Sequence, residues 1–247
     1  MVTAIVLRAA GTNCDYETVF ALEKAGFEVD NLHINELIKS HSALKEAQLL
    51  VLPGGFSYGD YLGSAKVFAN QLKLNLREPI EEFISEKKLV LGICNGFQAL
   101  VKAGLLPGNT GLWKQTTTLT FNNSGHFQDE WVTLENTSKN STPFLKGISE
   151  FDCPINHGEG KFVAQDKKTL QELYDQGQVA LKYKANPNGS TDSIAGISSL
   201  DGLVFGLMPH PEKHTFSINH PHSTRKEMDE IGSGFKIFQN AFEYLKK

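Results

Sequence analysis

Cys94 lies in the segment of the chain that is best suited to chemistry. An apolar stretch at 88–93 leads into the motif G-x-C-x-G at 92–96, and a helical pattern follows. This order is the nucleophile elbow of hydrolases, with cysteine in the place of serine. We expect a strained turn in which side chains at Gly92 and Gly96 would collide with backbone. The N–H groups at the helix start favour a thiolate and an oxyanion, so Cys94 is predicted to be a nucleophile. The alternative is a buried, inert cysteine between helix-packing glycines.

A thiol nucleophile needs an imidazole within hydrogen-bond reach and a third group that orients the imidazole. Of the eight histidines, His210 directly follows an apolar strand pattern and stands between two prolines, with Glu212 two positions on. Proline fixes its own φ, and residues two apart in extended backbone point to the same side. Glu212 is therefore predicted to contact the ring nitrogen of His210 that faces away from sulfur. The alternative is a loop in which both side chains are solvated.

A glycine-rich segment, LPGGFSYGD at 52–60, follows another apolar strand pattern. Three glycines in this segment leave backbone N–H groups approachable, as an oxyanion hole requires. A phosphate-binding loop is the weaker alternative, since no Lys-Ser/Thr follows at the required spacing. A plain turn is the third possibility.

The elements that must position these residues alternate along the first half of the chain. Strands are predicted at 2–7, 27–34, 47–52 and 88–93, and helices at 16–25, 65–77, 79–87 and 96–103. Continuous apolar strands alternating with helices predict an α/β fold: an open, mostly parallel sheet with helices on both faces. Ligand sites in such sheets gather at the carboxyl ends of strands, where the candidate residues lie.

Beyond Gly108 the pattern changes to alternating apolar and polar residues. Further strands are predicted at 115–121, 130–134, 179–183, 194–197 and 203–207, with a closing helix at 231–245. Alternation of this kind is typical of half-buried antiparallel strands, so an antiparallel elaboration is expected in the second half. No repeat or linker interrupts the chain, and residues 1–247 are predicted to form a single domain.

The composition excludes several classes of protein. There are 24 Lys+Arg against 28 Asp+Glu, a formal charge of −4, which argues against a nucleic-acid binder. No apolar run approaches the roughly 20 residues of a membrane helix, and the first residues lack the features of a secretion signal. Three cysteines cannot all pair, so a reduced, cytoplasmic setting is expected.

The motifs together resemble the class I (triad) glutamine amidotransferases, and most closely the PurQ-type glutaminase subunits of phosphoribosylformylglycinamidine synthase. The features that carry this likeness occur in the family's order across nearly the whole chain. They are Asn13-Cys14-Asp15, LPGGFSYGD (52–60), LGICNGFQAL (91–100), AGLLPG (103–108), HGEG (157–160), NPNGS (186–190), IAGI (194–197) and LMPHPE (207–212).

The resemblance implies a role for each candidate. Cys94 would attack the side-chain amide of glutamine to give a thioester and ammonia. His210 would transfer the protons, and Glu212 would orient His210. The remaining candidates for oxyanion and substrate binding are Gly54, Gly55, Phe56, Asn95, Gln98, His157 and Gly158, with the 157–160 loop.

The resemblance also implies partners. Ammonia would pass to a PurL-type synthetase subunit that makes formylglycinamidine ribonucleotide in purine biosynthesis, and a small PurS-type third subunit joins many such assemblies. No nucleotide-binding loop is evident, so no cofactor is expected in this chain, and ATP and Mg²⁺ would belong to the synthetase. The chain's own Met and its end soon after the closing helix imply a free-standing subunit.

Three positions depart from the family pattern. His126 and Glu130 stand where arginines are common, and Lys213 replaces another arginine, which it cannot match as a bidentate fork. These changes bear on partner docking. The 213–230 segment is also longer than usual and carries His214, His220 and His222. Because this tract lacks cysteine companions and the H-E-x-x-H pattern, we expect a solvated or partner-facing loop and no metal site.

The remaining cysteines and two further functions complete the expectations. Cys14 is predicted to belong to a structural cap region, although it could approach the active site, and Cys153 is predicted to be buried. A cysteine hydrolase or peptidase of related sheet architecture would turn over peptides or esters without glutamine. A non-catalytic binding subunit is disfavoured, because an idle site need not retain Cys94, His210 and Glu212 at these spacings.

Overall fold

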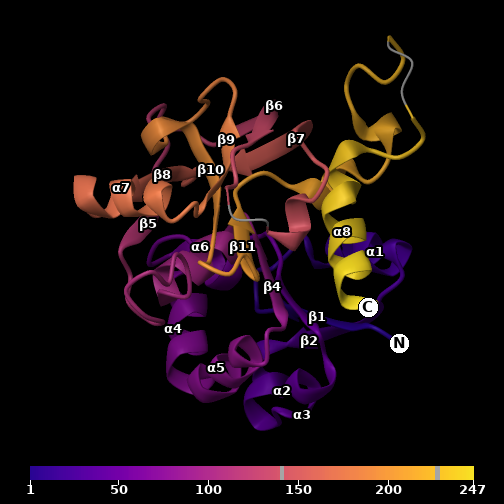
Figure 1. Ribbon diagram of the computed structural model, residues 1–247, viewed down its shortest axis with the longest axis vertical. Coiled ribbons are helices and arrows are strands. Elements are labelled where there is room, and N and C mark those ends of the chain that lie inside the picture. Colours follow the sequence, from indigo (N-terminus) through magenta and orange to yellow (C-terminus); the bar gives the residue numbers. More distant parts are fainter. Residues whose placement is uncertain (140–141, 226–228) are drawn as a thin grey trace.

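The computed structural model describes residues 1–139, 142–225 and 229–247. A nine-stranded sheet runs through the molecule in the order β2-β1-β3-β4-β11-β10-β9-β6-β7 (Figure 1). The five parallel strands are β1 (Thr3–Arg8), β2 (Glu28–His33), β3 (Leu49–Leu52), β4 (Leu89–Ile93) and β11 (Val204–Leu207). The sheet continues antiparallel through β10 (Ile194–Ser198), β9 (Val179–Tyr183), β6 (Gln128–Asn136) and β7 (Glu150–His157). The predicted α/β class with an antiparallel elaboration is confirmed.

The central strands are buried along their whole length. Every residue of β3, β4 and β11 is inaccessible to solvent or nearly so, which is why these strands read as continuous apolar runs. The edge strand β2 is partly exposed and correspondingly polar. These three strands are adjacent and parallel, so their carboxyl ends lie next to one another.

Helices cover both faces of the sheet (Figure 1). On one side α1 (Asp15–Ala25) contacts α8 (Lys236–Leu245), and on the other α4 (Lys66–Asn75) contacts α6 (Asn95–Ala103). Shorter connections include α2 (Ile34–Lys39), α3 (Ser42–Glu46) and α5 (Arg77–Ser85). A second sheet pairs β5 (Thr117–Thr120) with β8 (Lys161–Ala164), and α7 (Lys167–Asp175) follows β8. Among the described residues, no helix has both the length and the apolar character needed to cross a bilayer.

The structure departs from the predicted elements in two respects. The closing helix begins at Lys236 rather than at 231, because Ile231 pairs with Phe216 and Gly234 packs against the backbone of Pro211. The stretch around Cys153 and Pro154 is strand-like in the sequence and forms β7, whereas α2, α3, β8 and α7 were not predicted. Proline is tolerated on edge strands, and β7 is the edge of the sheet.

Candidate active site

Cys94 occupies the corner between β4 and α6. Its backbone has φ 48° and ψ −104°, a conformation that a residue with a side chain adopts only under constraint. A Cβ at Gly96 would lie 1.8 Å from the carbonyl oxygen of Leu52, and one at Gly92 would lie 2.6 Å from Leu100 Cδ1. The predicted strained turn, and the steric need for both glycines, are confirmed.

His210 reaches this corner from the neighbouring strand. Strands β4 and β11 are parallel, with Leu207 opposite Ile93, and the Cys94 N–H donates to the Leu207 carbonyl oxygen at 2.8 Å. Beyond β11 the chain is held by a 2.8 Å hydrogen bond from the His210 N–H to the carbonyl oxygen of Pro154. Two segments more than a hundred positions apart in the sequence therefore meet at the carboxyl ends of β4 and β11.

His210 and Glu212 form a buried pair. The Nδ1 atom of His210 lies 2.6 Å from Glu212 Oε1, and the two side chains are 1% and 0% exposed. This is the predicted contact. The Nε2 atom of His210 and the Oε2 atom of Glu212 are buried and have no partner among the residues described. With Nδ1–H donating to the carboxylate, Nε2 is left as the proton acceptor.

Cys94 itself is protonated in this environment. Burial raises the pKa of its thiol, and electrostatic interactions with the Cys14 thiol and the Glu212 carboxylate raise it further. The N–H of Asn95 and the ammonium of Lys213 lower the pKa, but by less. The N–H at the helix start favours the thiolate, as predicted, but desolvation outweighs it in the unliganded protein. A base must remove the thiol proton during the reaction.

The glycine-rich segment packs directly against this pair. A Cβ at Gly54 would lie 2.6 Å from His210 Cε1, so only glycine fits there. The Phe56 N–H already donates to the carbonyl oxygen of Gly11 at 2.9 Å, so Phe56 is not a free oxyanion donor, contrary to the prediction. No backbone acceptor within the described part of the chain is found for the N–H groups of Gly54 and Gly55. With that of Asn95, they remain the candidates.

The side chains of Asn95 and Gln98 hold the surrounding loops. The carboxamide oxygen of Asn95 accepts from the Ser57 N–H and hydroxyl at 3.1 and 2.6 Å, and its Nδ2 donates to Gln98 Oε1 at 3.0 Å. Gln98 Nε2 in turn donates to the carbonyl oxygen of Glu159 at 2.7 Å. Both side chains thus hold the loops around the site, and the role of Gln98 in positioning the substrate stays a prediction.

His157 lies in the same buried region, at the end of β7. Its Nδ1 donates to Asn122 Oδ1 at 3.1 Å, and its Nε2 has no partner among the described residues. Burial, together with a smaller electrostatic contribution from His210, lowers the pKa of His157 to about 4, so the ring is neutral. Space is open around Gly158, where an added Cβ would meet nothing within 4 Å.

Cys14 is closer to the chemistry than its predicted role as a cap implies. It precedes α1 and caps it without a side-chain hydrogen bond. Its Sγ and the ligand atoms of His210 and Glu212 all lie within 4.8 Å of one another. Such a cluster has the donor types of a soft metal site. However, burial raises the pKa of Cys14 to about 12, and the imidazole and carboxylate already share a proton. This arrangement suits proton transfer better than metal binding.

Sequence reasoning missed Asn156 as a neighbour of the nucleophile. The Cys94 thiol lies 3.7 Å from the carbonyl oxygen of Asn156, and Lys213 Nζ donates to Asn156 Oδ1 at 2.7 Å. The lysine at 213, where the family pattern has arginine, therefore makes a single hydrogen bond beside the site.

The other two departures from the family pattern, Glu130 and His126, are exposed. The available signal for β7 was the alternation of Phe151, Cys153 and Ile155, which Pro154 interrupts; Cys153 is buried as predicted.

Two histidines of the tract are buried, contrary to the expectation of a solvated loop. His214 and His220 are 3% and 5% exposed, and both rings pack on Trp131 with centroids 4.8 and 4.6 Å away. His222 is exposed. Of the 213–230 segment, residues 226–228 lie outside the described residues. The tract is thus anchored on β6 through Trp131.

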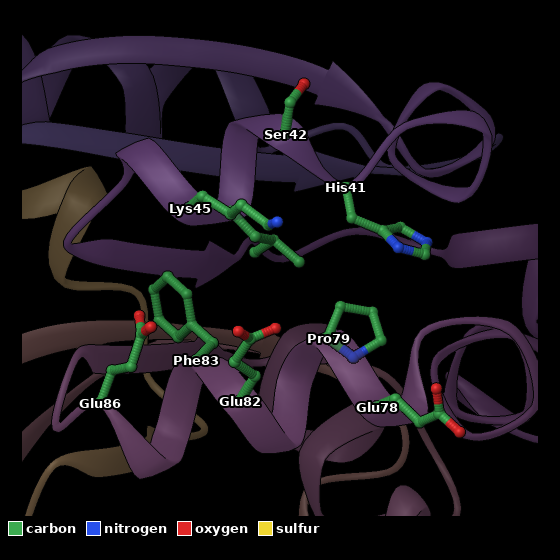
Figure 2. Close-up of a pocket in the computed structure, with 9 residues that line it drawn as sticks. His41, Ser42, Lys45, Glu78, Pro79, Glu82, Phe83 and Glu86 are labelled. Carbon is green, nitrogen blue, oxygen red and sulfur yellow. The ribbon is translucent and has the colours of Figure 1, made fainter.

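A groove of about 370 Å³ lies elsewhere, between α3 and α5. Side chains of the two helices face one another across it, with Lys45 on α3 opposite Pro79, Glu82 and Phe83 on α5 (Figure 2). Since α3 leads into β3 and α5 leads into β4, the groove lies at the amino ends of these strands. It is therefore at the opposite edge of the sheet from Cys94.

Known proteins that resemble this chain in sequence and structure agree with the chemistry of the site. Residues 1–245 match the CobB/CobQ-like glutamine amidotransferase domain. The PurQ subunit of phosphoribosylformylglycinamidine synthase from Dehalococcoides mccartyi is 42% identical, covering 100% of this chain and 98% of that protein. The same subunit from Treponema denticola is 40% identical, covering 92% of this chain and 94% of its own length. A chain in the structure of PurLQS from Thermotoga maritima has a TM-score of 0.78 at 34% identity, with 99% of each chain covered. The chain belongs to the CobB/CobQ-like glutamine amidotransferase family and, within it, to the PurQ subunits of phosphoribosylformylglycinamidine synthase.

Proposed function

We propose that this chain is the glutaminase subunit of phosphoribosylformylglycinamidine synthase. It hydrolyses glutamine at Cys94 and delivers the ammonia to a synthetase subunit that makes formylglycinamidine ribonucleotide. The observation that carries the proposal is the buried His210–Glu212 pair, 2.6 Å apart, at the end of the strand that neighbours the one bearing Cys94. An imidazole oriented in this way, with one free nitrogen, is the base that a protonated thiol requires.

The first half-reaction forms the thioester. His210 Nε2 takes the thiol proton as Cys94 Sγ attacks the side-chain amide carbon of glutamine. The developing oxyanion accepts from the N–H of Asn95 and from those of Gly54 and Gly55. Preorganised donors of this kind are each worth about 10²–10³ in rate. His210 then gives its proton to the amide nitrogen, the carbon–nitrogen bond breaks, and ammonia leaves.

The second half-reaction regenerates the enzyme. His210, neutral again, takes a proton from water as the water oxygen attacks the thioester carbon. The carbon–sulfur bond breaks, the proton returns to Cys94, and glutamate leaves. Glu212 stabilises the imidazolium in both halves and holds the ring in one tautomer.

Partners follow from the family. The chain works with a PurL-type synthetase and, in assemblies of the PurLQS kind, with a small third subunit. ATP and Mg²⁺ are used by the synthetase, and the reaction at Cys94 needs no cofactor. Three free, buried cysteines suit a reducing cytoplasm.

The test is to separate the two sources of ammonia. In the complex with its synthetase, Cys94→Ser is expected to abolish glutamine-dependent formation of the amidine while ammonium salts still support it. The result that would overturn the proposal is full glutamine-dependent activity in this variant. Glutamine-independent turnover of peptides or esters by the isolated chain would instead favour a cysteine hydrolase.

A further inference from the structure

Lys102 carries a buried positive charge on α6, the helix that begins beside the nucleophile. Its side chain is 9% exposed. The ammonium donates to the carbonyl oxygen of Ser64 at 2.5 Å and lies 3.6 Å from Glu159 Oε2. Asn95, Gln98 and Lys102 are spaced i, i+3 and i+7, so they form one polar stripe on an otherwise apolar helix. Sequence reasoning did not single out Lys102, although this spacing of polar residues on an apolar helix could have indicated it.

The stripe joins two loops that flank Cys94. Glu159 belongs to the 157–160 loop; its carboxylate accepts from the Ser64 N–H at 3.3 Å, and its main-chain oxygen accepts from Gln98. Ser64 belongs to the segment that continues from the oxyanion candidates. Lys102 therefore contacts both loops at the point where they meet, and ties them to the helix of the nucleophile.

The segment that Lys102 holds is under backbone strain. Tyr58, Asp60 and Ala65 have φ values of 56°, 54° and 56°, in the left-handed region that disfavours side chains. Strain of this kind persists only where surrounding contacts enforce it. Asp60 supplies some of them, because its carboxylate accepts from the Ala65 N–H at 2.8 Å and from Asn95 Nδ2 at 3.2 Å.

The charges around Lys102 are arranged to balance. Burial lowers the pKa of Lys102, but the carboxylates of Glu159 and Asp60 raise it, while nearby Lys66 lowers it slightly. Burial raises the pKa of Asp60, and the charge of Glu159 adds to that. The two carboxylates thus repel each other, and the ammonium of Lys102 compensates both. Removing it leaves two partly buried carboxylates without the cation that contacts Glu159.

We propose that Lys102 is a positioning residue of the glutaminase site. Its charge holds the strained 57–65 segment and the 157–160 loop against α6, so that the oxyanion donors and the walls around Cys94 keep their relative positions. The inference rests on the proposed function, because its readout is glutamine turnover.

The test is Lys102→Met, which keeps the length of the side chain and removes the charge. In the complex with the synthetase, kcat/KM for glutamine is expected to fall by about 10–100-fold, since a misplacement of about 1 Å has effects of this size. Lys102→Arg, which keeps the charge, should recover at least half of the loss on a logarithmic scale. The matched control is Lys88→Met. Lys88 is partly buried, at 14% side-chain exposure, and bonds to two carbonyl oxygens and a carboxylate far from the site.

A double variant separates positioning from general destabilisation. If Lys102 acts through Glu159, Lys102→Met in a Glu159→Gln background should cost less than about threefold, because coupled residues are not additive. If Lys102→Met fails to fold, the double variant, in which both charges are removed, is measured in its place. Its activity is then expected to lie near that of Glu159→Gln alone. Wild-type kcat/KM in Lys102→Met, or an equal loss in Lys88→Met, would overturn the inference. Absence of any Cys94-dependent glutaminase in the wild type would instead overturn the proposed function.

Discussion

At the scale of single residues, the chemistry of the site depends on removing the proton of the Cys94 thiol, because Cys94 does not rest as a thiolate. The pKa of Cys94 is raised by burial, and Nε2 of His210, which has no partner in the described part of the chain, is the available acceptor. The carboxylate of Glu212 accepts a hydrogen bond from the opposite ring nitrogen. Attack therefore depends on His210 being held in the tautomer that leaves Nε2 free.

Glu212→Gln tests that dependence. The amide is almost the same size, but it neither fixes the tautomer nor stabilises the imidazolium, so kcat for glutamine is expected to fall by about a hundredfold or more. Thermal unfolding should change little by comparison. Glutaminase activity within about threefold of wild type would show that the carboxylate is not needed for proton transfer.

His157 predicts a specific loss of stability in acid. Its pKa is lowered from 6.5 to about 4 by burial, so between these values the unfolded chain binds a proton that the folded chain does not. Stability is therefore complete above about pH 6.5 and falls as the pH drops toward 4, by on the order of 3 kcal/mol. Urea unfolding of His157→Gln should show a flatter pH dependence than wild type, whereas His126→Gln, at an exposed histidine, should not. Identical slopes in all three proteins would contradict the assignment.

Residue types and spacing predicted Cys94 and the contact between His210 and Glu212, but they said less about the residues around them. The contact of His210 with Glu212 followed from local spacing and extended backbone. The position of Cys14 beside His210 depends on how α1 packs across the carboxyl ends of the strands, which local sequence does not encode. The engagement of the Phe56 N–H by Gly11 depends likewise on a contact between distant loops.

At the scale of elements, glycines set how closely α6 approaches the sheet. The absence of a side chain at Gly96 lets the first turn of α6 lie against the carbonyl oxygen of Leu52 on β3. The helix can then present its first N–H groups at the elbow. The geometry of the nucleophile thus depends on backbone contact between two elements.

Gly96→Ala should disturb this contact strongly. An added Cβ would lie 1.8 Å from the Leu52 oxygen, and backbone cannot yield as a flexible side chain does. We expect a loss of about 3 kcal/mol in the free energy of unfolding, at the upper end for overpacking. Gly158→Ala, where nothing lies within 4 Å, is the control in the same urea measurement. Equal stability of both variants would mean that the elbow relaxes freely.

Periodicity predicted the parallel half of the sheet because its central strands are buried on both faces. It was less informative where tertiary contacts decide. Strand β7 contains Pro154 and is an edge strand, and the start of α8 is delayed by the pairing of Ile231 with Phe216. The short helices α2 and α3 have too few residues for a periodic signal.

At the scale of the whole molecule, exposed apolar side chains gather on the segment next to the oxyanion candidates. Tyr61 and Leu62 are 91% and 76% exposed, and Phe56, at 43%, packs against Phe127. The same segment is bonded internally to Asn95 and Lys102. Binding of the synthetase here would act directly on the catalytic loops. We expect low glutaminase activity in the isolated chain and a rise when the synthetase binds.

Leu62→Ser tests that coupling. Burying one leucine is worth about 1.5–3 kcal/mol, or about 10–100-fold in affinity. The variant should need correspondingly more synthetase for half-maximal activation, with the activity of the isolated chain unchanged. Leu74→Ser on α4, at a leucine that is 79% exposed, is the matched control. A normal activation curve for Leu62→Ser would place the synthetase contact elsewhere.

The most direct test of the mechanism is to trap the acyl-enzyme. Wild-type complex mixed with glutamine, quenched in acid within the first turnover and digested, should yield one glutamyl adduct, on the peptide that contains Cys94. Cys14→Ala should retain that adduct, and Cys94→Ala should form none. An adduct on Cys14, or steady consumption of glutamine by Cys94→Ala, would contradict the central assignment.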